Sequence, residues 1–272
     1  MIYADHAATT KISETAKLAM LSAMEKDWYN PSSLYTPGQQ ASGTLMDARV
    51  RIAHCLGCLP KEIYFTSGGS EADNQAILSA AAIGKRQGKM HIISTAFEHH
   101  AVLHTLKKLE KEGFEITLLD VGEKGIVSPV QVEKAIRPDT ILVTVMYANN
   151  EIGTIQPIRE IGAICRKNGV LFHTDAVQAA GHLQINVEKD QIDMLSLSAH
   201  KFNGPKGIGV LYAKTGVFLT NLIEGGGQER GKRAGTENLP AIVGMVAALE
   251  EACSLQKERS IYVTKLRDQL ID

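Results

Sequence analysis

The sequence has no large excess of charge and few aromatic residues. Its 272 residues carry 29 Lys and Arg against 30 Asp and Glu, and aromatic residues make up 5%. Sequence-independent binding to nucleic acid needs clustered cationic charge, and the basic cluster Arg230 to Arg233 is short. We therefore expect no nucleic-acid partner. A hydrophobic content of 44% over this length favours one large domain with a sizeable core.

Long apolar runs and a secretory signal are also missing. Runs such as residues 76–83 are too short to span a bilayer, so we expect no membrane role. Near the N-terminus, Asp5 comes early and no basic stretch precedes an apolar run, which favours a cytoplasmic protein. A transit peptide that has already been removed is compatible with this pattern.

Cysteines are few, which suits a reducing compartment. Cys55 and Cys58 have the Cys-x-x-Cys spacing, but no second ligand pair follows at a usable distance. We therefore interpret them as incidental core cysteines. Cys165 and Cys253 fall in helical patterns, and no metal site is expected.

Lys201 follows an apolar stretch that alternates as a buried strand does, and the glycine-rich segment 204–207 comes directly after it. A lysine at such a strand end can lose its proton and attack a carbonyl, forming a Schiff base. A solvated surface lysine is the ordinary alternative. Lys206 is the rival, but Pro205 and the flanking glycines favour a turn there.

Asp175 ends a second apolar run, beginning at Val170. A carboxylate in that position needs a cation nearby, and the protonated ring nitrogen of pyridoxal phosphate (PLP) is one such partner. Gln178, three residues on, is placed to hydrogen-bond the ring oxygen. Asp is also a favoured helix N-cap, and both interpretations can hold together.

A strand, a glycine turn and a helix start occupy residues 64–74. Unpaired backbone amides at a helix N-terminus bind anions, and Gly68 and Gly69 let the backbone approach a phosphate. An ordinary strand-to-helix connection is the alternative. No Walker pattern follows the turn, and residues 204–209 lack the dinucleotide spacing, so nucleotide binding is a minor possibility.

His99 and His100 follow another strand-like segment, where an imidazole could lie over a cofactor ring. Neighbouring histidines rarely share one metal ion because adjacent side chains point in different directions.

Seven strand-like runs alternate with helical patterns along most of the chain. The runs are residues 62–66, 90–94, 115–119, 140–146, 170–174, 194–198 and 209–212. This alternation predicts an α/β domain with a largely parallel sheet, in which ligands gather at the C-terminal ends of the strands. The candidate residues all lie shortly after such strands.

Eight motifs together resemble the cysteine desulfurases, PLP enzymes of the class V aminotransferase group. In order, they are residues 5–10, 30–33, 66–74, 98–99, 149–153, 174–178, 198–201 and 235–238. The resemblance implies a fold type I large domain, with a mostly parallel mixed sheet flanked by helices. Its activity would release sulfur from L-cysteine, giving L-alanine and an enzyme persulfide for iron-sulfur cluster assembly or another pathway.

The resemblance assigns roles by position. Lys201 would form the Schiff base with PLP, and Asp175 would pair with the ring nitrogen. His99 would stack on the ring and shuttle a thiol proton. The remaining implied contacts are Gln178 and Asn150 at the ring oxygen or substrate carboxylate, Gly69, Ser70, Ser198 and His200 around the phosphate, and Thr236 at the phosphate of a neighbouring subunit.

The resemblance also implies a homodimer, a possible sulfur-acceptor protein, and a further C-terminal part. That part would carry the acceptor cysteine and an arginine for the substrate carboxylate, and no cysteine of this sequence matches the acceptor position. We divide the chain into an N-terminal segment (1–15), a PLP-binding large domain (16–250) and the start of a truncated C-terminal region (251–272). The isolated chain is expected to be inactive.

Two alternatives stay open at this point. Another class V PLP reaction, such as selenocysteine lysis or transamination, would use the same scaffold. A catalytically incomplete PLP-binding module would bind the cofactor without releasing sulfur.

Overall fold

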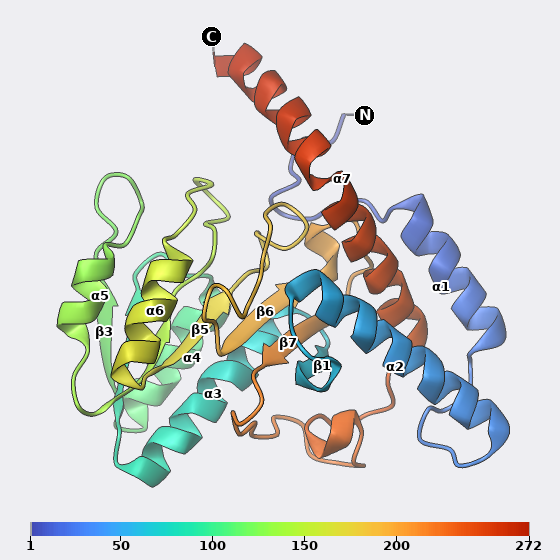
Figure 1. Ribbon diagram of the computed structural model, residues 1–272, viewed down its shortest axis with the longest axis horizontal. Coiled ribbons are helices and arrows are strands. Elements are labelled where there is room, and N and C mark those ends of the chain that lie inside the picture. The colour runs from blue at the N-terminus through green and yellow to red at the C-terminus, as the bar shows by residue number, and fades with distance from the viewer. Residues whose placement is uncertain (1, 272) are drawn as a thin grey trace.

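The computed structural model describes residues 2–271; Met1 and Asp272, the outer ends of the two proposed terminal segments, lie outside the described part. Figure 1 shows a layered α/β arrangement around one twisted sheet, from which the C-terminal helix projects. The strands are β1 (Ile63–Thr66), β2 (His91–Thr95), β3 (Glu115–Leu119), β4 (Thr140–Thr144), β5 (Leu171–Asp175), β6 (Met194–Ser198) and β7 (Gly209–Ala213). The α-helices are α1 (Glu14–Lys26), α2 (Thr36–Leu56), α3 (Gly69–Gln87), α4 (His100–Lys111), α5 (Pro129–Ala135), α6 (Ile158–Asn168) and α7 (Leu239–Ile271). Short 3-10 turns are η1 (Pro60–Glu62), η2 (Ala199–Lys201) and η3 (Glu229–Gly231).

The sheet has the order β1-β7-β6-β5-β4-β2-β3. Strand β7 is antiparallel to both β1 and β6, and the other pairs are parallel. The predicted mostly parallel mixed sheet is therefore confirmed, and each of the seven predicted strands is present. The fourth ends at Thr144, two residues earlier than predicted, because residues 145 and 147 bond individually to β5 and then turn away.

Alternation along the strands produces two cores, one on each face of the sheet. Val143, Phe172 and Leu195 pack with α2, α6 and α7, whereas Leu142 and Met194 pack with α3 and α4. Helices cover both faces of the sheet, and the parallel strands that they connect all end at the same edge. The helices thus leave that edge for the site.

Helix α7 changes its surroundings along its length. Its first half is buried, whereas Ile261, Tyr262 and Val263 are each at least 60% exposed, on the part that projects in Figure 1. Within residues 2–271, α7 alone is long and apolar enough to cross a membrane, so the expectation that every apolar stretch is too short was wrong for this helix. However, 56% of its most apolar window is buried inside the protein, as in a core helix.

Candidate active site

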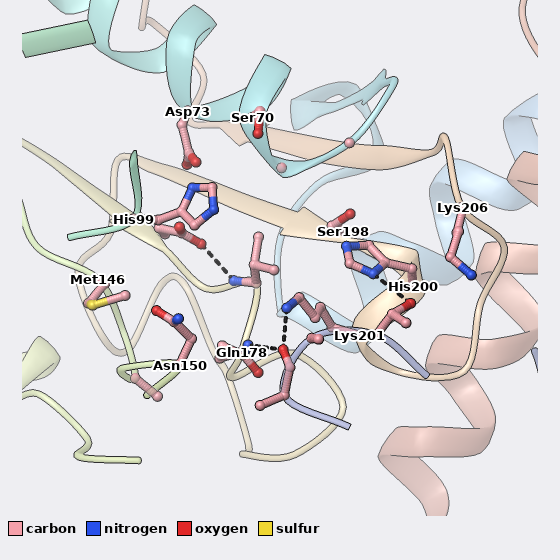
Figure 2. A pocket seen from close by; sticks show the side chains of 18 of the residues that line it. Ser70, Asp73, His99, Met146, Asn150, Gln178, Ser198, His200, Lys201 and Lys206 are labelled. Atoms are coloured by element: carbon pink, nitrogen blue, oxygen red, sulfur yellow. Dashed lines mark hydrogen bonds between the residues drawn. The ribbon is translucent and has the colours of Figure 1, made fainter. Parts of the chain in front are cut away.

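One cavity of about 840 Å³ opens at the C-terminal edge of the sheet (Figure 2). Nine of the ten predicted site residues line it: Gly69, Ser70, His99, Asn150, Asp175, Gln178, Ser198, His200 and Lys201. The tenth, Thr236, is exposed after η3 and does not line it. The structure thus brings together residues spread over more than 130 positions of the sequence.

Lys201 lies in η2, the tight turn that follows β6. Its Nζ donates a hydrogen bond to the carbonyl oxygen of Ala7, and Gln178 Nε2 donates to the same oxygen at 2.9 Å. Burial lowers the pKa of Lys201, although Asp175 opposes this effect, so the amine gives up its proton more readily than a surface lysine does. Lys206 also lines the cavity, but its side chain is exposed and lies at the opposite end from His99 in Figure 2.

The turn after η2 depends on glycine at position 204. A Cβ built there would lie 2.7 Å from Ala199 Cβ and 2.9 Å from its carbonyl oxygen, which accepts a hydrogen bond from the Gly204 amide. This close approach folds the chain back directly after Lys201. The predicted glycine turn therefore fixes where the lysine leaves the sheet.

Asp175 ends β5 and is 6% exposed. Its Oδ1 accepts a hydrogen bond from the Val177 amide at 2.9 Å, so the carboxylate orders the following turn while its other oxygen remains at the cavity. Burial raises the pKa of Asp175, and the Val177 bond and the charges of His99 and Lys201 oppose that rise.

The turn between β1 and α3 supplies the anion-binding geometry. Gly68 has φ = 153°, and Gly69 begins α3 with its amide at the helix N-terminus. A Cβ on Gly69 would stand 2.6 Å from Val177 Cγ2, so the close approach requires glycine. The Ser70 and Ser198 hydroxyls face the cavity, and within residues 2–271 neither makes a hydrogen bond to protein.

His99 caps the N-terminus of α4, and its Nδ1 accepts a hydrogen bond from the Ala101 amide at 3.1 Å. An accepting Nδ1 leaves Nε2 as the atom that carries the proton of a neutral ring. His100 stacks on His104 instead, with ring centroids 5.2 Å apart, and lines a neighbouring hollow that shares Ser70 and His99 with the cavity.

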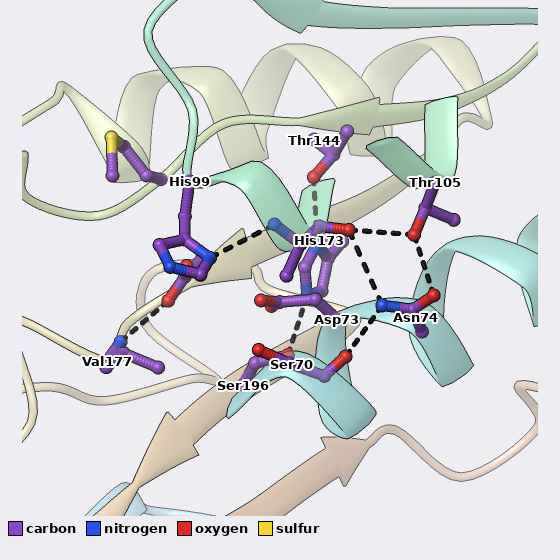
Figure 3. A network of polar contacts seen from close by, with 12 residues as sticks. Ser70, Asp73, Asn74, His99, Thr105, Thr144, His173, Val177 and Ser196 are labelled. Atoms are coloured by element: carbon purple, nitrogen blue, oxygen red, sulfur yellow. Dashed lines mark hydrogen bonds and ion pairs between the residues drawn. The ribbon is translucent and has the colours of Figure 1, made fainter. Parts of the chain in front are cut away.

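Sequence reasoning missed a buried polar network beneath this cavity (Figure 3). Two hydroxyls lie within hydrogen-bond distance of the His173 ring: Thr144 Oγ1 is 2.8 Å from Nδ1, and Ser196 Oγ is 3.0 Å from Nε2. Burial lowers the pKa of His173 to about 3, so the ring is neutral. Asp73 Oδ1 lies 3.6 Å from His173 Nε2 and has no hydrogen-bond partner within residues 2–271. The signal in the sequence was an acid on the apolar face of α3.

Asp73 and Asp175 form a close pair of buried acids. One oxygen of each lies within 4.8 Å of the other and of a ring nitrogen of His99. Burial, followed by the charge of Asp175, raises the pKa of Asp73 well above its usual value. Two carboxylates this close disfavour each other's ionisation in a buried site, and Asp175 in addition accepts the Val177 amide and has Lys201 as a neighbouring cation. The pKa of Asp73 is therefore raised further than that of Asp175.

Glu98 is a third buried acid at this end of the sheet. Its Oε1 accepts hydrogen bonds from Thr95 Oγ1 at 2.6 Å and from the Met146 amide at 3.0 Å. Burial nevertheless raises its pKa to about 8. Glu98 thus connects the end of β2 to the segment that follows β4, beside the cavity. With this pKa its carboxyl group is mostly neutral at pH 7.

The N-terminal segment also reaches the cavity. Asp5, Ala7 and Thr9 line it, and Thr9 Oγ1 lies 3.1 Å from His200 Nδ1. Thr10 bonds back to the His200 carbonyl oxygen through both its amide and its hydroxyl. These contacts link the start of the chain to the lysine turn, across about 190 residues of sequence.

Comparison with known proteins agrees with this site. The chain matches the class V aminotransferase family over residues 2–270. It is 51% identical over 271 residues to the cysteine desulfurase IscS of Methanosarcina thermophila, covering 100% of this chain and 67% of that protein. The IscS of Clostridium botulinum is 51% identical over 270 residues, with 99% and 68% covered.

Solved structures give the same result. A NifS-like protein superposes with a TM-score of 0.96 at 40% identity, covering 99% of this chain and 74% of that one. A structure of SspA in complex with cysteine gives a TM-score of 0.88 at 43% identity, with 92% and 72% covered. The chain thus spans about two thirds of the length of its curated relatives, and it belongs to the class V aminotransferase family and, within it, to the cysteine desulfurases.

Proposed function

We propose that the cavity binds PLP and that the enzyme uses it to release sulfur from L-cysteine, giving L-alanine and an enzyme persulfide. One observation carries this proposal: an amine with a lowered pKa, a buried carboxylate and a glycine turn at a helix N-terminus face the same cavity of about 840 Å³. These are the three groups that a phosphorylated pyridine aldehyde requires.

The phosphate end fits the glycine turn. The amides at the start of α3 point at the cavity with the positive end of the helix dipole behind them. The unpaired hydroxyls of Ser70 and Ser198 and the half-buried ring of His200 supply further donors. We assign these residues, with Gly69, to the phosphate.

The ring end fits Asp175 and its neighbours. A carboxylate at Asp175 favours a protonated pyridine nitrogen, and the raised pKa of Asp73 disfavours a second negative charge beside it. We assign Gln178 and Asn150 to the ring oxygen or the substrate carboxylate, and His99 to the face of the ring.

PLP, when bound, supplies an electron sink for the bond broken at the substrate Cα. Lys201 would hold the cofactor through Nζ, and its amine would accept and return the proton of the substrate Cα. His99 carries its proton on Nε2, the atom that is free to face a substrate thiol. The N-terminal segment and the β4 loop exclude part of the solvent from these groups.

The remaining proposals concern the complete enzyme. We propose a cytoplasmic homodimer in which Thr236 reaches the phosphate of the other subunit, with sulfur passed to an acceptor protein. Residues 16–250 would form the PLP-binding domain between an N-terminal segment (1–15) and the start of a C-terminal region (251–272). The acceptor cysteine and the substrate-binding arginine are not assigned to this chain.

Reduction of the PLP-treated protein with borohydride, followed by peptide mapping, tests the proposal. A pyridoxyl label on Lys201 is the expected result, because this amine is half-buried beside Asp175. A label on Lys206, or PLP binding without any modified lysine, would contradict it. Absorbance before and after reduction measures occupancy, and assay of sulfide and alanine from L-cysteine measures the reaction.

A further inference from the structure

Two thiols from different helices line a second cavity, outside the candidate active site. This cavity, about 430 Å³, lies between the end of α2, residues 180–186 and the middle of α7. Cys55 of α2 and Cys253 of α7 both line it. Cys253 is exposed, and Cys55 is half-buried against the main core. A reagent from solvent therefore reaches Cys253 first.

Hydrogen bonds from side chains of α2 and α7 flank the two cysteines on both sides. One helical turn before them, Arg51 Nε donates to Glu250 Oε1 at 2.9 Å. One turn beyond Cys253, Gln256 Nε2 donates to the His182 carbonyl oxygen at 3.0 Å. Side chains three or four residues apart share a helix face, so these contacts hold Cys55 and Cys253 at the same cavity.

The two thiols differ in exposure and in how readily they ionise. The neighbouring Cys253 thiol, followed by burial, raises the pKa of Cys55. The neighbouring Cys55 thiol lowers the pKa of Cys253, which is the more exposed of the two. The first thiolate therefore forms on the exposed partner, and the thiolate is the nucleophile in disulfide exchange.

We propose that Cys55 and Cys253 form a dithiol site that reacts with small disulfides of the glutathione class and closes to a disulfide joining α2 to α7. In the first step, the Cys253 thiolate attacks one sulfur of the small disulfide, forms a mixed disulfide and releases one small thiolate. In the second, Cys55 loses its proton to solvent and attacks the Cys253 sulfur. This step forms the Cys55–Cys253 bond and releases the second small thiolate. The small disulfide is reduced and the two protein thiols are oxidised.

The other two cysteines serve as internal controls. Neither lines the cavity. Burial raises the pKa of Cys58 to about 12, and Cys165 is fully buried in the core. Both should stay reduced while the protein is folded, and alkylation of Cys165 would report unfolding.

The experiment equilibrates the full chain with oxidised and reduced glutathione, alkylates the free thiols and maps the peptides by mass spectrometry. We expect a cross-linked pair of peptides containing Cys55 and Cys253, a loss of two hydrogen masses, and reversal by excess reduced glutathione. Cys55→Ser should retain one glutathione on Cys253, because nothing resolves the mixed disulfide. Cys253→Ser should leave Cys55 unmodified, and Cys58→Ser should close as the wild type does.

Two results would overturn the proposal. One is a stable glutathione adduct on Cys253 of the wild type, with Cys55 still open to alkylation. The other is a folded wild-type protein, with Cys165 protected, in which oxidised glutathione modifies neither cysteine. Neither result depends on PLP or on desulfurase activity, so this test is independent of the proposed function.

Discussion

At the scale of single residues, the first prediction concerns the amine of Lys201. Lys201→Ala should bind PLP without the absorbance of a protein Schiff base, because the amine beside Asp175 is gone, while the fold stays intact. Absorbance spectroscopy checks this, with circular dichroism as the test of folding. Lys206→Ala is the matched control and should keep the absorbance, since Lys206 is exposed at the far end of the cavity. The reverse pattern would transfer the role to Lys206.

The second residue-scale prediction concerns the proton on Asp73. A carboxyl whose folded pKa is raised makes the protein lose stability as pH rises above the unfolded pKa, until the folded pKa is reached. Asp73→Asn removes that penalty. Relative to wild type, the variant should gain up to about 1.4 kcal/mol per pH unit above about pH 4. Urea unfolding of the PLP-free protein at several pH values measures this slope.

A different charge state would give the opposite sign. If Asp73 were ionised and paired with a protonated His173, Asn would weaken the fold and the difference would not grow with pH. The burial of His173, which lowers its pKa to about 3, argues against that pair. The sign of the slope thus shows whether Asp73 is protonated or ionised in the folded protein.

At the scale of elements, the turn from β1 into α3 carries the third prediction. Gly69→Ala places a methyl group 2.6 Å from Val177 Cγ2, which forces the phosphate turn and the turn after Asp175 apart. We expect PLP affinity to fall roughly tenfold or more, equivalent to the loss of at least one charge-assisted hydrogen bond. Gly43→Ala is the control: Gly43 lies inside α2, and apart from the backbone of its own helix no atom of residues 2–271 lies within 4 Å of the added carbon. It should bind PLP normally and gain about 0.5–1 kcal/mol of stability.

Elements were also what the sequence predicted best. Each of the seven strands was expected within two residues, because buried strands alternate or run continuously apolar and are bounded by glycine and polar turns. Lys201 and Asp175 were found for the same reason: polar residues stand out at the ends of apolar strands.

Long-range contacts could not be found in that way. Nothing local in α3 indicates that Asp73 faces Asp175, because the pairing depends on how α3 crosses the sheet. The pairing of Cys55 with Cys253 likewise depends on where α7 returns over α2, about 200 residues later. The role of Thr236 stays a prediction, since one chain alone does not bring that residue to the cavity.

At the scale of the whole molecule, the segment around η3 closes the free edge of the sheet. Among residues 2–271, strand β1 pairs with β7 alone, so its outer edge needs other partners. Arg49 Nη1 donates to the Ile63 carbonyl oxygen at 2.7 Å, and Glu229 Oε2 accepts from the Phe65 amide at 3.0 Å. Arg49 and Glu229 are themselves joined at 2.6 Å in a buried ion pair. Side chains from distant segments thus replace a missing strand.

This arrangement gives the last prediction. Arg49→Ala should destabilise the protein by about 3–5 kcal/mol, because it leaves the buried Glu229 carboxylate without its ion-pair partner and removes one of the two guanidinium donors to the Ile63 carbonyl oxygen. Arg51→Ala is the matched control on the same helix. Its partner Glu250 is 40% exposed, and loss of that pair should cost about 1 kcal/mol or less. Urea unfolding of both variants measures the difference. Equal losses would mean that the Arg49–Glu229 pair adds nothing beyond an ordinary surface contact, and that β1 does not need these side chains at its free edge.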